Sequence, residues 1–270
     1  MDKNLIYAYK NYRKTIMSYW ETYIFDKLMV VEMEKLIRND IIKCFTLESL
    51  SNPWNNGNTI RHFLKKDMLG ITQRNSSRLQ YRRTIIEAVA TTEIFFQKIC
   101  EIVYKDFPGR IKNNNSDENN IYREKLFDII INCNTRDEIL DKISEEKIRS
   151  IFYGNPIDFF IKDKGNIGLE DYFSKNHNLA IEKYKEIIAR RNIIIHNNGK
   201  VDSKYLREIK NSGYRLGQIP NTNEMYLREM IFILRGLSAT TTKIVLENIY
   251  KFNCNAPLLN TVNFFKKVFP

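Results

Sequence analysis

Apolar residues recur at steps of three and four along almost the whole chain, and this spacing constrains the fold more than any other feature of the sequence. The spacing is present in residues 4–45, from about residue 77 to residue 108, and from about residue 221 to residue 252. No stretch alternates apolar and polar residues as a half-buried strand does, and no repeat has the length of a solenoid unit. The sequence therefore predicts an all-α protein.

Turn-forming and capping residues divide this pattern into separate helices. Residues 50–58 and 112–120 are rich in Asn and are expected to be loops. Shorter helices are predicted at residues 122–133, 135–151 and 202–209, the second opened by a capping box at Thr135 and Glu138. A further helix is expected to begin at Asn176 or Asn178 and to stop at Gly199.

The length of 270 residues is enough to bury a sizeable core. We expect three parts: an N-terminal helical extension (residues 1–77), a helical domain (residues 78–252), and a C-terminal tail (residues 253–270) that packs on the body. The formal net charge of +11 favours an anionic partner, with nucleic acid first and an anionic membrane second. A lysine-rich surface inherited from an A/T-rich genome is the alternative explanation of this charge.

The cysteines and the apolar runs exclude several classes of protein. The four cysteines (Cys44, Cys100, Cys133 and Cys254) form no C-x-x-C pair, which argues against zinc sites and thioredoxin-like chemistry. No apolar run reaches the roughly 18 residues of a membrane helix, and the N-terminus lacks the apolar core of a signal peptide. We expect a soluble cytoplasmic protein that has no metal site, cofactor or membrane partner.

The helix that ends at Gly199 departs from simple amphipathic patterning. Its apolar stripe consists of Leu179, Ala180, Tyr184, Ile187, Ile188, Ile194 and Ile195. With about 3.6 residues per turn, Arg191 falls near the middle of this stripe, while Ile193 points to the opposite side. Asn192 and His196 are four residues apart and share an edge next to the stripe. Departures of this kind tend to mark functional sites.

A second charged residue lies on an apolar stripe elsewhere in the chain. Glu93 is four residues after Val89 and three before Phe96, and a carboxylate on a core face is costly unless it is paired. A buried Arg191 likewise requires an anionic group or a carbonyl oxygen beside it. We therefore expect Glu93 and Arg191 to meet, although a Glu at the edge of a stripe can also reach solvent.

Arg191 and His196 together suit the cleavage of RNA. A histidine ring can take a proton from a 2′-hydroxyl and return one to the leaving oxygen, while a guanidinium binds the non-bridging phosphate oxygens. Asn192 can orient the phosphate or the ring, and Arg190, Lys200 and Lys204 add positive potential for the RNA backbone. No cluster of carboxylates with metal-ligand spacing lies nearby in the sequence, so a two-metal mechanism is not indicated.

The string Arg191-Asn192-x-x-x-His196 resembles the signature of the HEPN superfamily of helical proteins. The doubled Arg, the Ile run and the His-Asn-Asn-Gly turn match, as do Val201-Asp202 and Tyr205-Leu206 opening another helix. The resemblance covers residues 78–252 and implies an antiparallel helical bundle. The helix with Glu93 also resembles the first helix of several HEPN families, where an acidic residue supports the Arg of the motif.

The resemblance implies a metal-independent endoribonuclease that leaves a 2′,3′-cyclic phosphate. Such proteins commonly act on cellular RNA such as tRNA, as toxins or antiviral defence effectors, and work with an antitoxin or another defence protein. Their active site is usually composite, since each subunit of a homodimer gives Arg and His. An outward-facing Ile193 agrees, because a dimer would bury it.

Several alternatives stay open at this stage. Some HEPN toxins carry a Tyr two residues after the His, where this chain has Asn198, so control through that Tyr is not expected. Arg191 and His196 can instead be structural, in a non-catalytic helical module that binds nucleic acid or a partner protein. A DNA-binding regulator ranks last, because no helix-turn-helix pattern is evident. We expect His62 and His177 to be structural.

Overall fold

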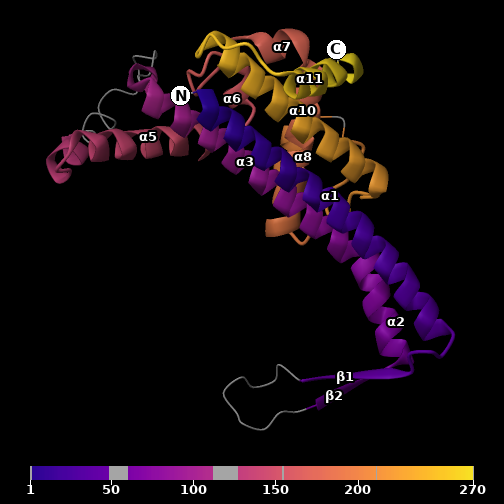
Figure 1. Ribbon diagram of the computed structural model, residues 1–270. Coiled ribbons are helices and arrows are strands. Elements are labelled where there is room, and N and C mark those ends of the chain that lie inside the picture. The colour runs from indigo at the N-terminus through magenta and orange to yellow at the C-terminus, as the bar shows by residue number, and fades with distance from the viewer. Residues whose placement is uncertain (1, 49–59, 112–126, 154, 211, 270) are drawn as a thin grey trace.

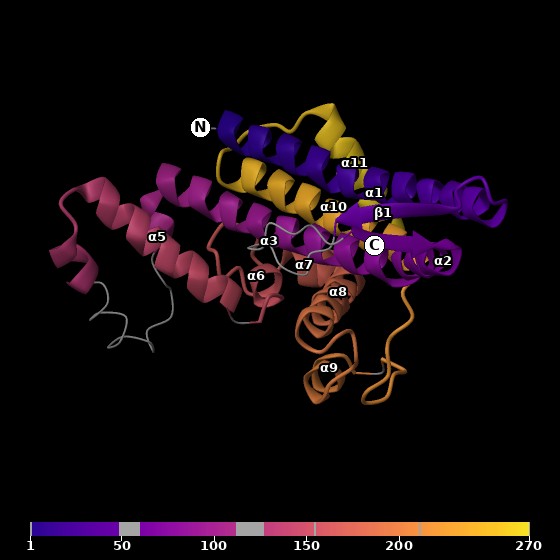
Figure 2. The same cartoon turned by 90° about the horizontal axis from the view of Figure 1, so that it is seen from below.

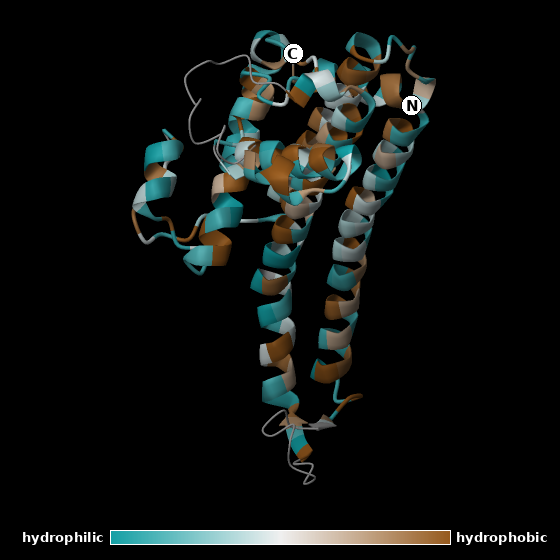
Figure 3. Ribbon diagram, turned by 90° about the vertical axis from the view of Figure 1, so that its left-hand side faces the viewer, coloured by the Kyte–Doolittle hydropathy of each residue, from teal (hydrophilic) through white to brown (hydrophobic). Residues whose placement is uncertain are grey.

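Four long helices carry most of the core in the computed structural model, which describes residues 2–48, 60–111, 127–153, 155–210 and 212–269. They are α1 (Asp2–Arg38), α3 (Gln80–Asp106), α8 (Asn178–His196) and α10 (Glu224–Asn248). The described residues are mostly helical, so the predicted all-α class is confirmed at this coarse level. Along the longest helices, hydrophobic and hydrophilic residues follow each other turn by turn, as the periodicity predicts (Figure 3).

A long helical arm extends from the body (Figure 1). The second half of α1 forms one side of this arm. The other side is α2 (Lys65–Arg74), followed without a break by the π-helical turn η1 (Asn75–Leu79) and by α3. The residues at both junctions have right-handed helical backbone angles, so α2, η1 and α3 form a single continuous helix that runs back along α1.

The end of the arm carries a two-stranded antiparallel sheet, which corrects the expectation that no strand is present. Strands β1 (Cys44–Glu48) and β2 (Ile60–Leu64) pair with Phe45 opposite Phe63, and the two rings stack with centroids 4.8 Å apart. Each strand has five residues, too few for a clear alternating pattern, and cross-strand pairing stabilises the strands instead. The predicted loop at residues 50–58 lies outside the described residues.

The first half of α1 belongs to the main core. Leu5 and Ile16 are fully buried in one cluster with residues of α3 and α10. The Tyr12 hydroxyl is hydrogen-bonded to Thr92 Oγ1 at 3.0 Å and donates to the Leu234 carbonyl oxygen at 3.2 Å, so it ties α1 to both neighbours. The predicted boundary at residue 77 falls inside η1, in the middle of the continuous helix.

Shorter helices connect α3 to α8. They are η2 (Pro108–Ile111), α5 (Arg136–Tyr153), α6 (Asp158–Ile161) and α7 (Tyr172–Asn176). Residues 127–132 are helical, and the preceding part of the helix predicted at residues 122–133, like the loop at residues 112–120, lies outside the described residues. The predicted capping contact of α5 is present, since the Glu138 backbone N–H donates to Thr135 Oγ1 at 3.2 Å.

The C-terminal segment forms α11 (Ala256–Val268), which packs on α10. The sequence predicted that this tail would pack on the body. Phe265 of α11 lies directly over Gly236 of α10, where an added Cβ would be only 2.0 Å from the ring. His177 is fully buried, and its Nδ1 lies 2.7 Å from the carbonyl oxygen of Phe269. A carbonyl can only accept, so the neutral ring donates from Nδ1, in the structural role expected for this histidine.

Of the two predicted ends of α8, the start is wrong and the stop is confirmed. The residue before the helix is His177 and provides no side-chain cap, so the expectation of an Asn cap is wrong; the buried ring is engaged by Phe269 instead. At the other end, Asn198 and Gly199 both have positive φ, 52° and 82°, and the Gly199 N–H donates to the Ile193 carbonyl oxygen at 2.8 Å. The predicted stop at Gly199 is therefore confirmed.

Candidate functional site

Arg191, Asn192 and His196 of α8 line one cleft of about 1250 Å³. Its walls come from α3, α5, residues 128 and 129, and α8, and Lys204 of α9 (Ser203–Glu208) completes the lining. In Figure 2, α5 and α8 both lie below α3, with α5 to the left and α8 to the right, and α9 lies beyond the end of α8. Arg191 and Asn192 are half-buried and His196 is exposed, so solvent reaches the imidazole at the end of the helix.

Glu93 and Arg191 meet, as expected. Arg191 Nη2 donates to Glu93 Oε1, and both side chains are largely buried, with exposed fractions of 19% and 23% for Arg191 and Glu93. Burial raises the pKa of the Glu93 carboxyl, and the neighbouring guanidinium lowers it by less. Arg191 Nε is buried and has no hydrogen-bond partner among the described residues, whereas the side chain as a whole is partly exposed and lines the cleft.

The cleft as a whole carries charges of both signs. Its lining includes five carboxylates (Glu93, Glu101, Asp128, Glu145 and Glu146) and four cations (Lys142, Arg149, Arg191 and Lys204) besides His196. Of the carboxylates, Glu145 and Glu146 lie on α5, and Glu101 lies on α3 away from the motif. The α5 part of the lining is balanced in charge, because Lys142 and Arg149 lie beside Glu145 and Glu146, and Arg149 pairs with Glu146 at 3.5 Å.

The structure reverses the expected exposure of two isoleucines. Ile193 is 2% exposed, because Val201 and Tyr205 pack against it within the same protomer, so its burial does not require a dimer. Ile195, which was expected in the apolar stripe, is 46% exposed at the end of α8. Leu179, which was also expected in the apolar stripe, is exposed near the start of the helix.

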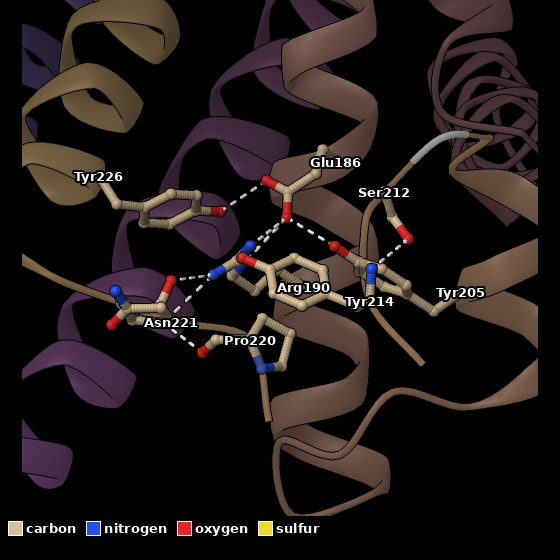
Figure 4. A network of polar contacts seen from close by, with 9 residues as sticks. Glu186, Arg190, Tyr205, Ser212, Tyr214, Pro220, Asn221 and Tyr226 are labelled. Carbon is tan, nitrogen blue, oxygen red and sulfur yellow. Dashed lines mark hydrogen bonds and ion pairs between the residues drawn. The ribbon is translucent and has the colours of Figure 1, made fainter. Parts of the chain in front are cut away.

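Arg190 is buried, which contradicts its expected role as a free cation for RNA. Arg190 donates from Nε to Glu186 Oε1 at 2.7 Å and from Nη1 to the Asn221 carbonyl oxygen at 2.8 Å. The hydroxyls of Tyr205 and Tyr226 donate to Glu186 at 2.8 and 2.9 Å, and the Tyr226 ring lies against the guanidinium (Figure 4). The ion pair of Arg190 and Glu186 thus holds Tyr205, Asn221 and Tyr226 against α8, and the charge of Arg190 is neutralised within the protein.

The two predicted lysines remain at the surface. Lys204 is exposed, lines the cleft, and has only a distant ion pair with Glu208 at 3.9 Å. Lys200 is exposed in the turn after α8, where its carbonyl oxygen accepts from Asn197 Nδ2 at 2.7 Å. Both lysines lie within eight residues of His196 in sequence and add positive charge next to the imidazole.

Two arginines that the sequence did not single out converge on the end of α8. Arg78 Nη2 and Arg82 Nη1 both donate to Asn198 Oδ1, at 2.8 and 2.9 Å, and Arg82 Nη2 donates to the Ile194 carbonyl oxygen at 3.0 Å. A signal was present in the sequence: Arg83 has Glu87 four residues later, whereas the residue four after Arg82 is Ile86. Only the fold shows that Asn198 brings these two arginines to the motif.

No cluster of three or more His, Cys, Asp or Glu side chains within the described ranges is arranged as a metal site. In the same residues, no helix is long and apolar enough to span a membrane. His62 lies exposed on β2.

Comparison with family models, with curated proteins and with solved structures found no match to this chain.

Proposed function

We propose that this protein is a metal-independent endoribonuclease of the HEPN type, which acts on cellular RNA such as tRNA as a toxin or antiviral effector. The observation that carries the proposal is that Arg191, Asn192 and His196 line one cleft and that the imidazole of His196 is open to solvent. The resemblance of this string to the HEPN signature, at the end of a helix in a helical fold, supports the proposal.

The proposed reaction is a transesterification within the RNA chain. The 2′-oxygen attacks the adjacent phosphorus, the bond from phosphorus to the 5′-oxygen breaks, and the products are a 2′,3′-cyclic phosphate and a 5′-hydroxyl. A proton leaves the 2′-hydroxyl and a proton reaches the 5′-oxygen, so the step needs a base and an acid. His196 serves as one of these groups, and the partly exposed guanidinium of Arg191 stabilises the charge on the phosphorane oxygens. Asn192 holds the phosphate.

We propose a homodimer because the described lining of the cleft contains one histidine, whereas the reaction needs two proton transfers. Two copies that meet around the ends of their α8 helices supply two imidazoles to one composite site. Ile195 and Leu79 are exposed by 46% and 55%, and Ile195 is the residue next to His196. These two side chains provide apolar area for such an interface.

The distribution of charge around the cleft favours one path for the substrate. On α5, Lys142 and Arg149 line the cleft together with Glu145 and Glu146, so this side offers an RNA backbone no net attraction. The exposed Lys200 and Lys204 lie on the other side, near the end of α8. We therefore place the RNA across the end of α8 and the beginning of α9, with the scissile phosphate beside His196.

One observation favours a second function, a non-catalytic helical module that binds nucleic acid or a protein partner. Glu93 already neutralises Arg191, and a pair of this kind is also what a purely structural role would require. In this alternative the exposed His196 only ends the helix. The positive net charge of +11 suits binding without cleavage equally well.

Incubation of the purified protein with single-stranded RNA and excess EDTA separates the two functions. The nuclease predicts cleavage that persists with the chelator, cyclic phosphate ends, and loss of cleavage in Arg191→Ala and His196→Ala. His62→Ala is the matched control, because His62 is exposed on the distant arm and should leave cleavage unchanged. Binding of RNA by all four proteins with no cleavage by the wild type would establish the non-catalytic module.

A further inference from the structure

A pocket of about 340 Å³ lies between the start of α3, the end of α8 and residues 219–222. Its lining contains three arginines and no carboxylate. Arg190 is neutralised by Glu186, so it adds little charge to the pocket. Arg78 and Arg82 have no carboxylate within ion-pair distance in the described part of the chain, which distinguishes them from Arg83, paired with Glu87 at 2.9 Å.

Arg78 and Arg82 are held together by neutral oxygens only. Both guanidiniums donate to Asn198 Oδ1, and Arg82 also donates to the Ile194 carbonyl oxygen. Partial burial and the charge of Arg78 lower the pKa of the Arg82 guanidinium, as expected where two positive charges are held close together. These contacts use one N–H of Arg78 and two of Arg82, out of the five that each guanidinium carries. The remaining donors can bind an anion.

The remaining lining suits a phosphate attached to an organic group. Tyr81, Ile219 and Pro220 give the pocket an aromatic and apolar wall beside the arginines. A guanidinium pair matches the non-bridging oxygens of a phosphodiester, and an aromatic wall suits a sugar or base. Gly199 also lines the pocket, and an added Cβ there would make only an ordinary contact with Arg82 Nη2, at 3.8 Å.

The pocket and His196 are on different sides of α8. Ile194 and His196 are two positions apart, which turns them about 200° from each other around the helix. A strand that contacts both the arginines and the imidazole therefore has to cross the end of the helix, a width of about 10–12 Å. Asn198, two residues after His196, lies on this path and holds both arginines.

We infer that Arg78 and Arg82 form a phosphate-binding subsite for RNA, which holds a phosphodiester flanking the one that is cleaved. This inference rests on the proposed nuclease and gives Arg78 and Arg82 a binding role, since neither touches the reacting phosphate. It predicts that longer RNA gains affinity at this subsite, whereas a dinucleotide that fills only the His196 site does not.

The test compares Arg78→Ala and Arg82→Ala with Arg83→Ala, a neighbouring exposed arginine that is already paired with Glu87. All are made in the His196→Ala background, so that binding is measured without cleavage. For an RNA of about twelve nucleotides we expect affinity to fall about ten-fold in the first two variants and not in the third. The plot of log affinity against log salt should flatten by about 0.7 for each phosphate that the variant no longer neutralises.

A second measurement uses cleavage with His196 intact. Arg78→Ala should raise KM for the longer RNA and leave the cleavage of a dinucleotide unchanged. Arg78 is exposed, so this variant stays informative even if Arg82→Ala loosens the end of α8. Adenosine monophosphate is the control ligand: tight binding that depends on Arg78, with no effect of Arg78 on RNA, would overturn the inference in favour of a mononucleotide site.

The outcomes separate this inference from the proposed function. If the wild type does not cleave RNA, but Arg78→Ala and Arg82→Ala weaken RNA binding, the subsite is supported and the nuclease is rejected. Cleavage by the wild type, with equal RNA affinity in the Arg78, Arg82 and Arg83 variants, would support the nuclease and overturn the subsite.

Discussion

Arg191 on α8 and Glu93 on α3 lie 98 residues apart in the chain and form an ion pair on the wall of the cleft. Because both side chains are largely buried, Glu93→Gln leaves the guanidinium without its counter-charge. We expect this variant to lose about 1–3 kcal/mol of unfolding free energy and, under the proposed function, most of the RNA cleavage. Urea unfolding and a cleavage assay measure the two effects.

Glu87→Gln is the matched control, because Glu87 pairs with Arg83 at the surface of the same helix and should change stability by less than about 0.5 kcal/mol. A double variant, Glu93→Leu with Arg191→Met, should recover stability without recovering cleavage, since it removes both charges. An unchanged melting temperature for Glu93→Gln would mean that the ion pair contributes nothing to the stability of the fold.

The contact between Glu93 and Arg191 could be predicted because each residue interrupts an apolar stripe of its own helix, and one buried charge requires another. The long helices and the stop at Gly199 were also predictable, since periodicity and left-handed turns are local properties of the sequence. The same is true of the Asp202 cap, which accepts from the Tyr205 backbone N–H at 2.7 Å.

The faces of α8 were harder to predict, because a single helix does not show what covers it. Residues 201–205 and 214–222 fold over the side opposite the first stripe, so Ile193 and Arg190 are buried where exposure was expected. A Glu four residues before an Arg, as in Glu186 and Arg190, is also the common spacing of a surface pair. The contact between Arg78 and Asn198 could not be predicted for a similar reason, since the two residues are 120 positions apart in the chain.

Arg190→Met tests whether the buried network holds the segment after α8 in place. Arg190 is 4% exposed, and its loss leaves the partly buried Glu186 carboxylate, 21% exposed, with the hydroxyls of Tyr205 and Tyr226 as its remaining partners in the network. We expect a loss of about 3–5 kcal/mol in unfolding free energy, largely recovered when Glu186→Leu is added. Chemical unfolding of the single and double variants measures this. A stable Arg190→Met protein with weaker RNA binding would instead return Arg190 to the role of an RNA contact.

Gly236→Ala tests how closely α11 packs on α10. The added methyl carbon would lie 2.0 Å from the Phe265 ring, so the tail helix has to move away. We expect a loss of about 1–3 kcal/mol and faster proteolysis within residues 253–269. Gly70→Ala is the control, because only the flexible end of Arg74 lies nearby, at 3.4 Å, and this helical position should gain about 0.5–1 kcal/mol. Equal effects at the two glycines would rule out the close contact.

His177 makes stability depend on pH through the same tail. Burial lowers the pKa of His177, and the charge of Lys266 adds to this, while the bond to the Phe269 carbonyl oxygen acts the other way. The unfolded state therefore binds the proton more readily. The contribution of neutral His177 to the free energy of unfolding is complete above the usual pKa of about 6.5. It is lost as pH falls through the lower pKa of the folded state. The slope is at most about 1.4 kcal/mol per pH unit for one proton.

Urea unfolding at about pH 7.5 and about pH 5.5 measures this slope in the wild type and in His177→Asn. An Asn amide can still donate to Phe269 but does not titrate, so the variant should lose less stability on acidification. His62→Asn is the control, since His62 is exposed on β2 and its replacement should leave the wild-type slope. Among the described residues, the buried His177 Nε2 has no hydrogen-bond partner, so a proton added there would have no acceptor. If the free energy of unfolding changes equally with pH in the wild type and in His177→Asn, the pKa of His177 is not lowered by folding. The packing of the tail then does not make stability depend on pH.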